Sequence, residues 1–290
     1  CCTADRWDRT KGISAPPDES QSMKVDDFSA RPALGVGLKV TAILLFTFMS
    51  VIIKSLADEV PAGEAVFFRS FFAIPVILIW LAQRGKLGSG LKTRNPMGHV
   101  WRGLFGTTAM GLTFTGLGLL PLPEVTAIGF ATPIFTVILA AVLLGEQIRL
   151  VRVTAVAMGL VGVMIILWPR FTSIGTMEQT ATIGALLILM ATMLRSLVQI
   201  HIRQLVQHED TAAIVFYFSV TASLLALFTL PFGWVLPDAK TFGLLVLAGL
   251  IGGVEQILIT SAYRFGSASM LAPYDFTSML FANVLGYVFF

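Results

Sequence analysis

Three ionisable residues, Arg195, Glu255 and Asp275, lie inside long apolar stretches of this sequence. A charge at the depth of a lipid bilayer is costly and generally faces a partner or a polar cavity. Each residue lies roughly eight positions from one end of its stretch, which is about 12 Å along a helix. Two acids and one base at one depth predict either a buried pair, such as Arg195 with Glu255, or a site that carries a proton or a charged ligand.

Other polar residues extend this set. Gln199 and Arg203 follow Arg195 at helical spacing, and Asn283 lies two turns after Asp275 on nearly the same face. The candidates for a polar pathway are therefore Arg195, Gln199, Glu255, Asp275, Asn283, Arg69, Lys54 and Ser50.

Charges near the ends of the apolar stretches have simpler interpretations. Lys39 and Lys54 lie near the edges, where long side chains extend toward the lipid headgroups. Arg69 follows Glu64 by five residues, which favours an ion pair near the outer surface over a substrate contact. Lys54 and Arg69 are thus reserve candidates.

The sequence carries no enzyme motif. His99, His201 and His208 lack metal-ligand spacing, and the two cysteines, Cys1 and Cys2, are adjacent. Neither a phosphate-binding loop nor a serine nucleophile elbow occurs. We therefore expect no enzyme, no cofactor and no bound metal. The net charge of +3 is attributed to basic loops rather than to nucleic-acid binding.

The elements that must position these residues are membrane-spanning helices. Hydrophobic residues make up 56% of the chain and charged residues only 13%, whereas soluble domains carry about 25% charged residues. About 20 apolar residues cross the hydrocarbon core, and their backbone groups must pair within a helix. We predict an all-α polytopic membrane protein with spans at about 36–57, 64–82, 99–118, 124–144, 150–168, 181–203, 212–232, 241–262 and 267–290.

Basic residues are concentrated in alternate loops. The loop before the third span carries Arg84, Lys86, Lys92 and Arg94, and Arg102 was assigned to the same side. The loops on the other side carry only Arg170 and Lys240. Because cytoplasmic loops are enriched in Lys and Arg, we predict a cytoplasmic N-terminus in the inner (plasma) membrane.

The chain matches itself at an offset of 146 residues. Ser50 falls on Ser196, Gly106 on Gly252 and Phe130 on Phe276. The repeated unit holds five helices, an odd number, so the second copy would enter the membrane inverted. Inverted repeats are typical of carriers whose halves rock around a central site.

Residues 122–135 (LPEVTAIGFATPIF), followed by Leu144-Gly145-Glu146, resemble the EamA domain of the drug/metabolite transporter superfamily. The resemblance marks Pro133 as a mid-span kink and hinge, and Gly145 and Glu146 as the pair that closes this helix. It implies two domains of five helices, with a pathway lined mainly by the first, third, fourth, sixth, eighth and ninth helices. In the second half, Pro273 lies earlier than its counterpart.

Together these features predict three parts. Residues 1–34 form a disordered cytoplasmic tail, and Met23 is interpreted as the native start, which would leave residues 1–22 outside the native protein. Residues 35–169 form the first EamA repeat, and residues 180–290 form the second repeat, whose last helix and Gly-Glu pair are expected beyond Phe290.

We expect a permease or exporter of small metabolites, coupled to protons or to exchange. The alternatives are a non-transporting sensor or scaffold and, less favoured, a membrane-embedded enzyme. Small residues spaced as in Gly249-x-x-x-Gly253 suit helix packing or a homodimer equally.

Overall fold

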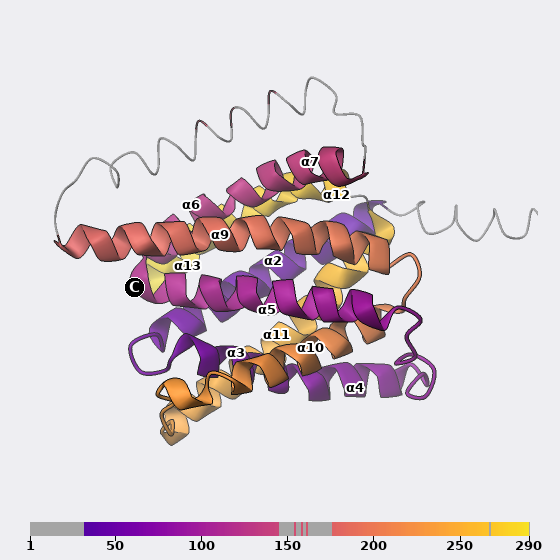
Figure 1. Cartoon of the computed structure of the whole chain (residues 1–290), viewed down its shortest axis with the longest axis horizontal. Coiled ribbons are helices and arrows are strands. Elements are labelled where there is room, and N and C mark those ends of the chain that lie inside the picture. Colours follow the sequence, from indigo (N-terminus) through magenta and orange to yellow (C-terminus); the bar gives the residue numbers. More distant parts are fainter. Residues whose placement is uncertain are drawn as a thin grey trace, which may run out of the picture.

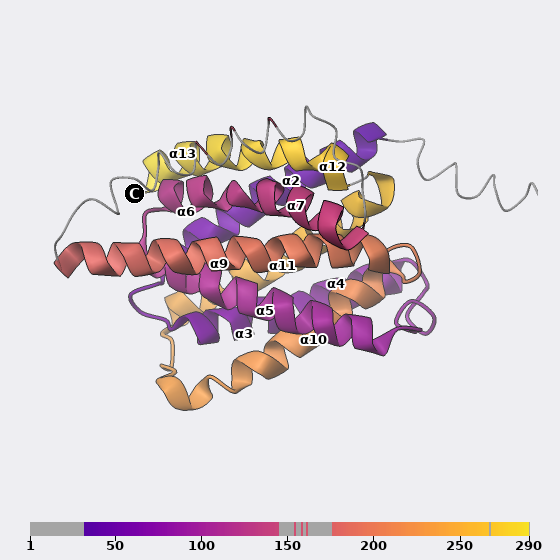
Figure 2. The same ribbon diagram turned by 45° about the horizontal axis from the view of Figure 1, so that its top comes forward.

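The computed structural model describes residues 32–144, 176–266 and 268–289, with Thr154, Met158 and Val161 between them. Every regular element in this part of the chain is helical, and the long helices run along the long axis of the bundle (Figures 1 and 2). The all-α class is confirmed. The predicted span at 150–168 and the Gly145–Glu146 pair lie outside the described residues.

Two sets of helices follow one another along the chain. The first is α2 (Pro32–Ser55), α3 (Ala62–Phe71), α4 (Ala73–Gln83), α5 (Pro96–Leu119), α6 (Leu122–Gly129) and α7 (Ala131–Leu144). The second is α9 (Thr176–Leu205), α10 (Thr211–Leu227), η1 (Leu230–Phe232), α11 (Ala239–Phe265), α12 (Ala268–Leu271), η2 (Ala272–Phe276) and α13 (Thr277–Phe289). Among the described residues, four helical segments are long and apolar enough to cross a membrane: Ala33–Ser55, Ala62–Gln83, Gln179–Leu205 and Ala239–Phe265.

Two predicted spans are each broken into two helices. Phe72 separates α3 from α4 three residues before Pro75, and Phe130 separates α6 from α7 three residues before Pro133. Proline lacks an N–H and its ring clashes with the carbonyl four residues earlier. The kink attributed to Pro133 therefore lies at Phe130, and the continuous helix predicted over 64–82 was wrong at Phe72.

The helix bounds follow the 146-residue offset. Adding 146 to the bounds of α5 gives 242–265, against Ala239–Phe265 for α11, and adding 146 to those of α7 gives 277–290, against Thr277–Phe289 for α13. Phe130 and its counterpart Phe276 mark the two breaks, and their ring centroids lie 4.9 Å apart. A duplicated unit would give this register; the inversion of the second copy stays a prediction.

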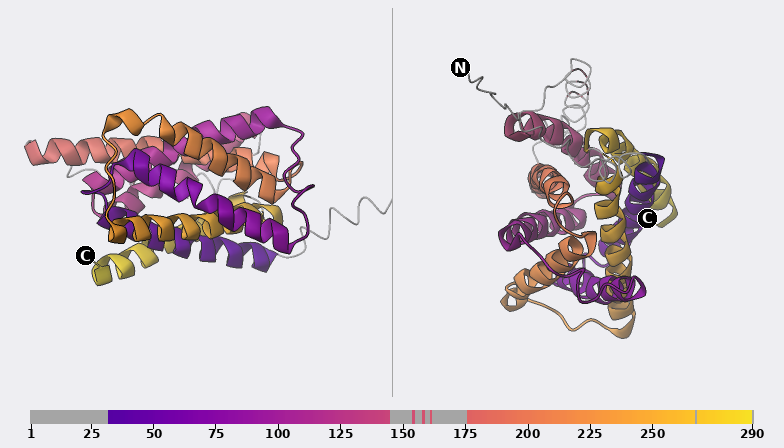
Figure 3. Two further views of the ribbon diagram at one scale, coloured as in Figure 1. Left: turned by 90° about the horizontal axis from the view of Figure 1, so that it is seen from below. Right: turned by 90° about the vertical axis from the view of Figure 1, so that its right-hand side faces the viewer.

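Helices from the two halves pack against each other rather than forming separate bundles. The most extensive packing joins α2 to α11 and α5 to α9, so each long helix has a principal neighbour from the other half. The end-on view shows helices of both halves around a common centre (Figure 3). The core between them includes Met49, Leu117, Ile128, Ile188 and Leu245.

Glu209, between α9 and α10, ties together the loops at one end of the bundle. Its Oε1 accepts hydrogen bonds from the Thr93 hydroxyl (3.0 Å), the Arg94 amide (2.7 Å) and the Asn95 amide (2.9 Å), just before α5 begins. Burial raises the pKa of Glu209, but these bonds outweigh burial and hold its pKa below the ordinary 4.5. Glu209 thus fixes where α5 begins.

Glu209→Gln should lower the free energy of unfolding by about 1–3 kcal/mol, because the three hydrogen bonds lose the negative charge that strengthens them. Chemical unfolding of the purified protein in detergent measures this change. Since the folded pKa is depressed, the wild-type contribution is present above pH 4.5 and disappears as pH falls through the lowered pKa. The matched control is Glu59→Gln, since Glu59 is an exposed acid that accepts a hydrogen bond from the Thr241 hydroxyl. Equal stability of the two variants would contradict the role of Glu209.

Candidate functional site

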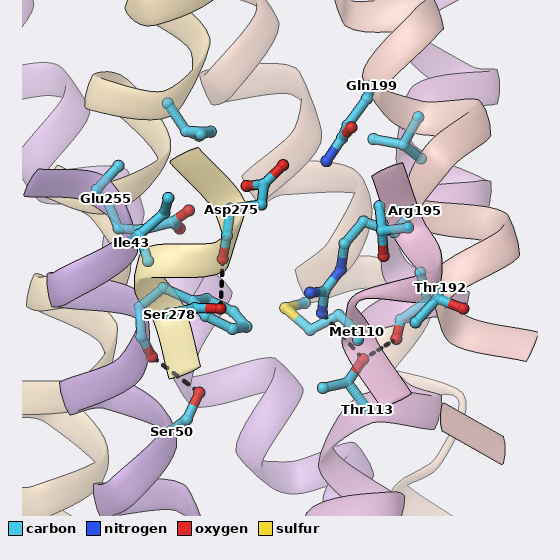
Figure 4. Close-up of a pocket in the computed structure, with 18 of the residues that line it drawn as sticks. Ile43, Ser50, Met110, Thr113, Thr192, Arg195, Gln199, Glu255, Asp275 and Ser278 are labelled. Carbon is cyan, nitrogen blue, oxygen red and sulfur yellow. Dashed lines mark hydrogen bonds between the residues drawn. The ribbon is translucent and has the colours of Figure 1, made fainter. Parts of the chain in front are cut away.

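A cavity of about 210 Å³ lies between α2, α5, α6, α9 and α11 and is closed in part by η2 and α13 (Figure 4). A single water molecule needs only about 10–15 Å³ measured in this way, so the cavity has room for a small solute. These elements belong to the six spans expected to line a pathway. Arg69 of α3 and Phe218 of α10 add one residue each.

One end of the cavity is entirely apolar, and the charged side chains lie in the remainder of its wall. Near the C-terminus of α5 and the start of α6, the wall consists of Phe114, Leu117, Leu122 and Ile188, all buried. The charged side chains that line the remainder come from both halves of the chain: Lys39, Arg69, Arg102, Arg195, Glu255 and Asp275.

Glu255 pairs with Arg69 rather than with Arg195. The distance from Arg69 Nη2 to Glu255 Oε2 is 3.0 Å, and the two side chains are 2% and 7% exposed. The expected Glu64–Arg69 pair was wrong: Glu64 Oε2 instead accepts a hydrogen bond from the Val235 amide at 3.1 Å. Five residues along a helix turn the side chain by about 500°, which leaves the two groups roughly 140° apart around the axis.

Asp275 pairs with Lys39, whose Nζ lies 2.7 Å from Asp275 Oδ1. Lys39 is 1% exposed and also donates to the Tyr263 hydroxyl at 3.4 Å. The expectation that Lys39 extends to the headgroups was therefore wrong. An acid on η2 of the other half offers it a buried partner, and a buried ion pair needs no water.

Arg195 lines the cavity without an acid. Its Nη2 donates to Thr113 Oγ1 at 3.3 Å, and its guanidinium carbon lies 5.2 Å from the centre of the Phe46 ring. Gln199 lies one turn further along α9, and its Oε1 accepts from the Thr136 hydroxyl at 3.2 Å. The buried Arg195–Glu255 pair predicted as one alternative does not form.

Arg102, expected among the loop cations, instead lines the cavity. It is 4% exposed, and its guanidinium carbon lies 3.9 Å from the centre of the Phe218 ring. Its Nη2 donates to Gln256 Oε1 at 3.2 Å, while Nε and Nη1 have no hydrogen-bond partner. In the sequence, a feature that could have indicated a buried position for Arg102 is Gly106, which lies one turn later on the same helix face.

Two glycines related by the repeat make room for arginines. A Cβ on Gly106 would meet Nη1 of Arg102, and a Cβ on Gly252 would lie 2.9 Å from Nε of Arg69. The sequence match between these glycines therefore has a structural counterpart at the cavity.

Of the three remaining candidates, Ser50 lines the cavity, whereas Lys54 and Asn283 do not. Ser50 lines the cavity and donates to the Phe46 carbonyl at 2.8 Å. Lys54 does not line it; its Nζ donates to the carbonyls of Leu117 and Leu120, both at 2.8 Å, and so caps the C-terminus of α5. Asn283 donates to the Met279 carbonyl from an exposed position away from the cavity.

Five of the polar side-chain contacts at the cavity join the first half of the chain to the second. They are Lys39–Asp275, Arg69–Glu255, Arg102–Gln256, Thr113–Arg195 and Thr136–Gln199. A movement of one half against the other would have to break them. Within the described residues, no group of three or more His, Cys, Asp or Glu side chains could hold a metal ion.

Comparison with known proteins identifies a domain in the first half of the chain. Residues 33–168 match the EamA-like transporter family. This part of the chain is an EamA-like domain. This match confirms the resemblance seen in residues 122–135. The apolar helices of the chain are those of a multi-pass membrane protein.

Relatives of this EamA-domain chain include transporters for different small molecules. It is 28% identical over 256 residues to the pseudopaline exporter of Pseudomonas aeruginosa strain UCBPP-PA14, covering 88% of this chain and 87% of the exporter. It is 27% identical to the S-adenosylmethionine uptake transporter of Rickettsia prowazekii, covering 82% and 78%. It is 27% identical to the riboflavin transporter of Rhizobium johnstonii, covering 90% and 84%. A solved crystal structure shares the fold, with a TM-score of 0.68 at 23% identity over 88% of this chain and 87% of that one.

Proposed function

We propose that this chain is a secondary transporter that moves a small metabolite across the inner membrane by alternating access. The observation that carries the proposal is the buried polar cavity between the two halves, bridged by ion pairs whose members come from different halves. Rocking of the halves would exchange these pairs for contacts with the substrate. The cavity would then open to one side of the membrane at a time.

The relatives support a small-molecule substrate but differ in direction. One is named an exporter and another an uptake transporter, although each aligns with most of this chain. The same architecture therefore serves either direction, and in this chain the direction would follow the driving force. An ion gradient and substrate exchange are the two sources we consider, with Glu255 or Asp275 as the group that would carry a proton.

The test is flux through the purified full chain in liposomes loaded with a panel of labelled metabolites. We expect saturable flux of at least one compound above that of protein-free liposomes, accelerated when the same unlabelled compound is trapped on the opposite side. Binding of a compound without any flux would overturn the proposal and would instead indicate a sensor.

Orientation gives a separate prediction. With Cys1 and Cys2 replaced by serine, single cysteines at Ser89 and Leu236 should report opposite sides, since both positions are exposed and lie in loops at opposite ends of helices. An impermeant thiol reagent applied to intact cells should label Leu236→Cys and spare Ser89→Cys. The reverse labelling pattern would contradict a cytoplasmic N-terminus.

A further inference from the structure

The described residues that line the cavity carry more positive than negative charge. Lys39, Arg69, Arg102 and Arg195 are cationic, and Glu255 and Asp275 are their only acidic counterparts in this part of the chain. Each acid forms an ion pair with one base: Glu255 lies 3.0 Å from Arg69, and Asp275 lies 2.7 Å from Lys39. Two arginines, Arg102 and Arg195, are left without an acid.

The groups in direct contact with these two arginines are uncharged. Among the described residues, neither has a carboxylate at ion-pair distance; their partners are the Gln256 amide, the Thr113 hydroxyl and the rings of Phe218 and Phe46. Amides, hydroxyls and rings supply partial charges only. Four cations and two acids leave the cavity wall with a net positive charge, and because cations away from water are costly without enough counter-charge, this excess favours a negative ligand.

The unused donors of the cavity match that ligand. Nε and Nη1 of Arg102 have no hydrogen-bond partner, although this side chain is 4% exposed and lines the cavity. The two groups lie on different edges of the guanidinium, so each can donate a separate charge-assisted hydrogen bond to a carboxylate or phosphate oxygen. Stacking on Phe218 holds the guanidinium in place.

The two arginines come from neighbouring helices of the cavity wall. Arg102 lies on α5 and Arg195 on α9, and these helices pack closely along their length. Figure 4 shows Arg195 opposite Asp275 and Glu255 across the cavity. An anion held by both arginines would therefore lie next to the two ion pairs and could compete with their acids for Arg69 and Lys39.

We infer that the cavity binds an organic anion, with Arg102 and Arg195 as the residues that recognise its carboxylate or phosphate groups. This inference rests on the proposed transport function, because it names the substrate class of the same cavity. The binding energy would come from charge-assisted hydrogen bonds inside a site that water has largely left.

The test uses the full chain in nanodiscs at neutral pH and constant ionic strength. The probes are succinate, glutarate and adipate, their neutral diamides, and the diamines of the same carbon number. We expect the dicarboxylates to raise the melting temperature in a saturable way and the diamides and diamines to have no effect. Stabilisation by diamines or diamides, or none by any dicarboxylate, would overturn the inference.

Variants locate the binding site. Arg102→Gln and Arg195→Gln should each weaken dicarboxylate binding at least tenfold, and the lysine variants, which keep the charge, should weaken it less. Arg84→Gln is the matched control, since Arg84 is exposed and lies outside the cavity on the Trp80 ring. Unchanged binding in both cavity glutamine variants would overturn the assignment.

Failure of this inference and failure of the transport proposal give different results. Flux of only cationic or neutral compounds in liposomes would overturn the anion assignment and leave transport intact. Dicarboxylate binding at Arg102 and Arg195 without flux of any compound would support the assignment and overturn the transport proposal.

Discussion

Replacing Glu255 with glutamine should abolish transport and should also reduce folded protein more than any other neutralisation in the cavity. The change leaves Arg69, whose side chain is 2% exposed, without its acid at 3.0 Å. Removing one partner of a buried ion pair costs about 3–5 kcal/mol, because the other charge stays buried and uncompensated. Size-exclusion yield and unfolding in detergent measure the folding effect, and flux per folded molecule measures transport.

A double variant separates the two effects. Arg69→Met with Glu255→Leu removes both charges and should recover much of the lost stability, since apolar pairs of similar volume replace buried ion pairs at little cost. Transport should stay absent in the double variant, because the contact between the halves can no longer exchange with a substrate. Wild-type flux in the double variant would contradict a role for this pair in transport.

Replacing Asp275 with asparagine should reduce flux at least tenfold, which corresponds to about 1.4 kcal/mol or more. The reason is the loss of the acid 2.7 Å from Lys39, the contact that joins α2 to η2 of the other half. The cost in stability should be smaller than for Glu255→Gln, because Asp275 is 20% exposed and an unpaired lysine can release its proton. Flux per folded molecule is the measurement.

The matched control for this change is Asp238→Asn, an acid-to-amide change at an exposed position that caps the start of α11. Asparagine caps helices as well as aspartate, so this variant should keep wild-type flux. The charge reversal Lys39→Asp with Asp275→Lys should restore folded protein. If Asp275→Asn itself transports at the wild-type rate, the Lys39–Asp275 pair has no part in the cycle.

Much of the fold was predictable because the bilayer restricts a chain of this composition to helices. In the described part of the chain, the helices lie where the apolar stretches of the sequence predict them. Their bounds also repeat at the offset of 146 residues. The helix breaks at Phe72 and Phe130 are a local steric effect of prolines three residues later. Counting apolar residues does not predict such breaks.

The candidate site was predictable in its members but not in its pairs. Arg195, Glu255 and Asp275 do line one cavity, because an ionisable group in an apolar helix must face a polar interior. Which base meets which acid depends on how helices far apart in sequence face each other. Lys39 and Arg102 were assigned to edges and loops for this reason: both lie near helix ends, and only the packing of α2 on α11 and of α5 on α10 buries them.

The central claim, alternating access through this cavity, is tested most directly by a single cysteine at Met110. Met110 lines the cavity, and Figure 4 places it beside Thr113 and Arg195. In a background with Cys1 and Cys2 replaced by serine, an impermeant thiol reagent should label Met110→Cys in right-side-out and in inside-out vesicles. Leu236 is 98% exposed, and Leu236→Cys should be labelled from one side only. Labelling of Met110→Cys from one side alone, under all ligand conditions, would contradict the account.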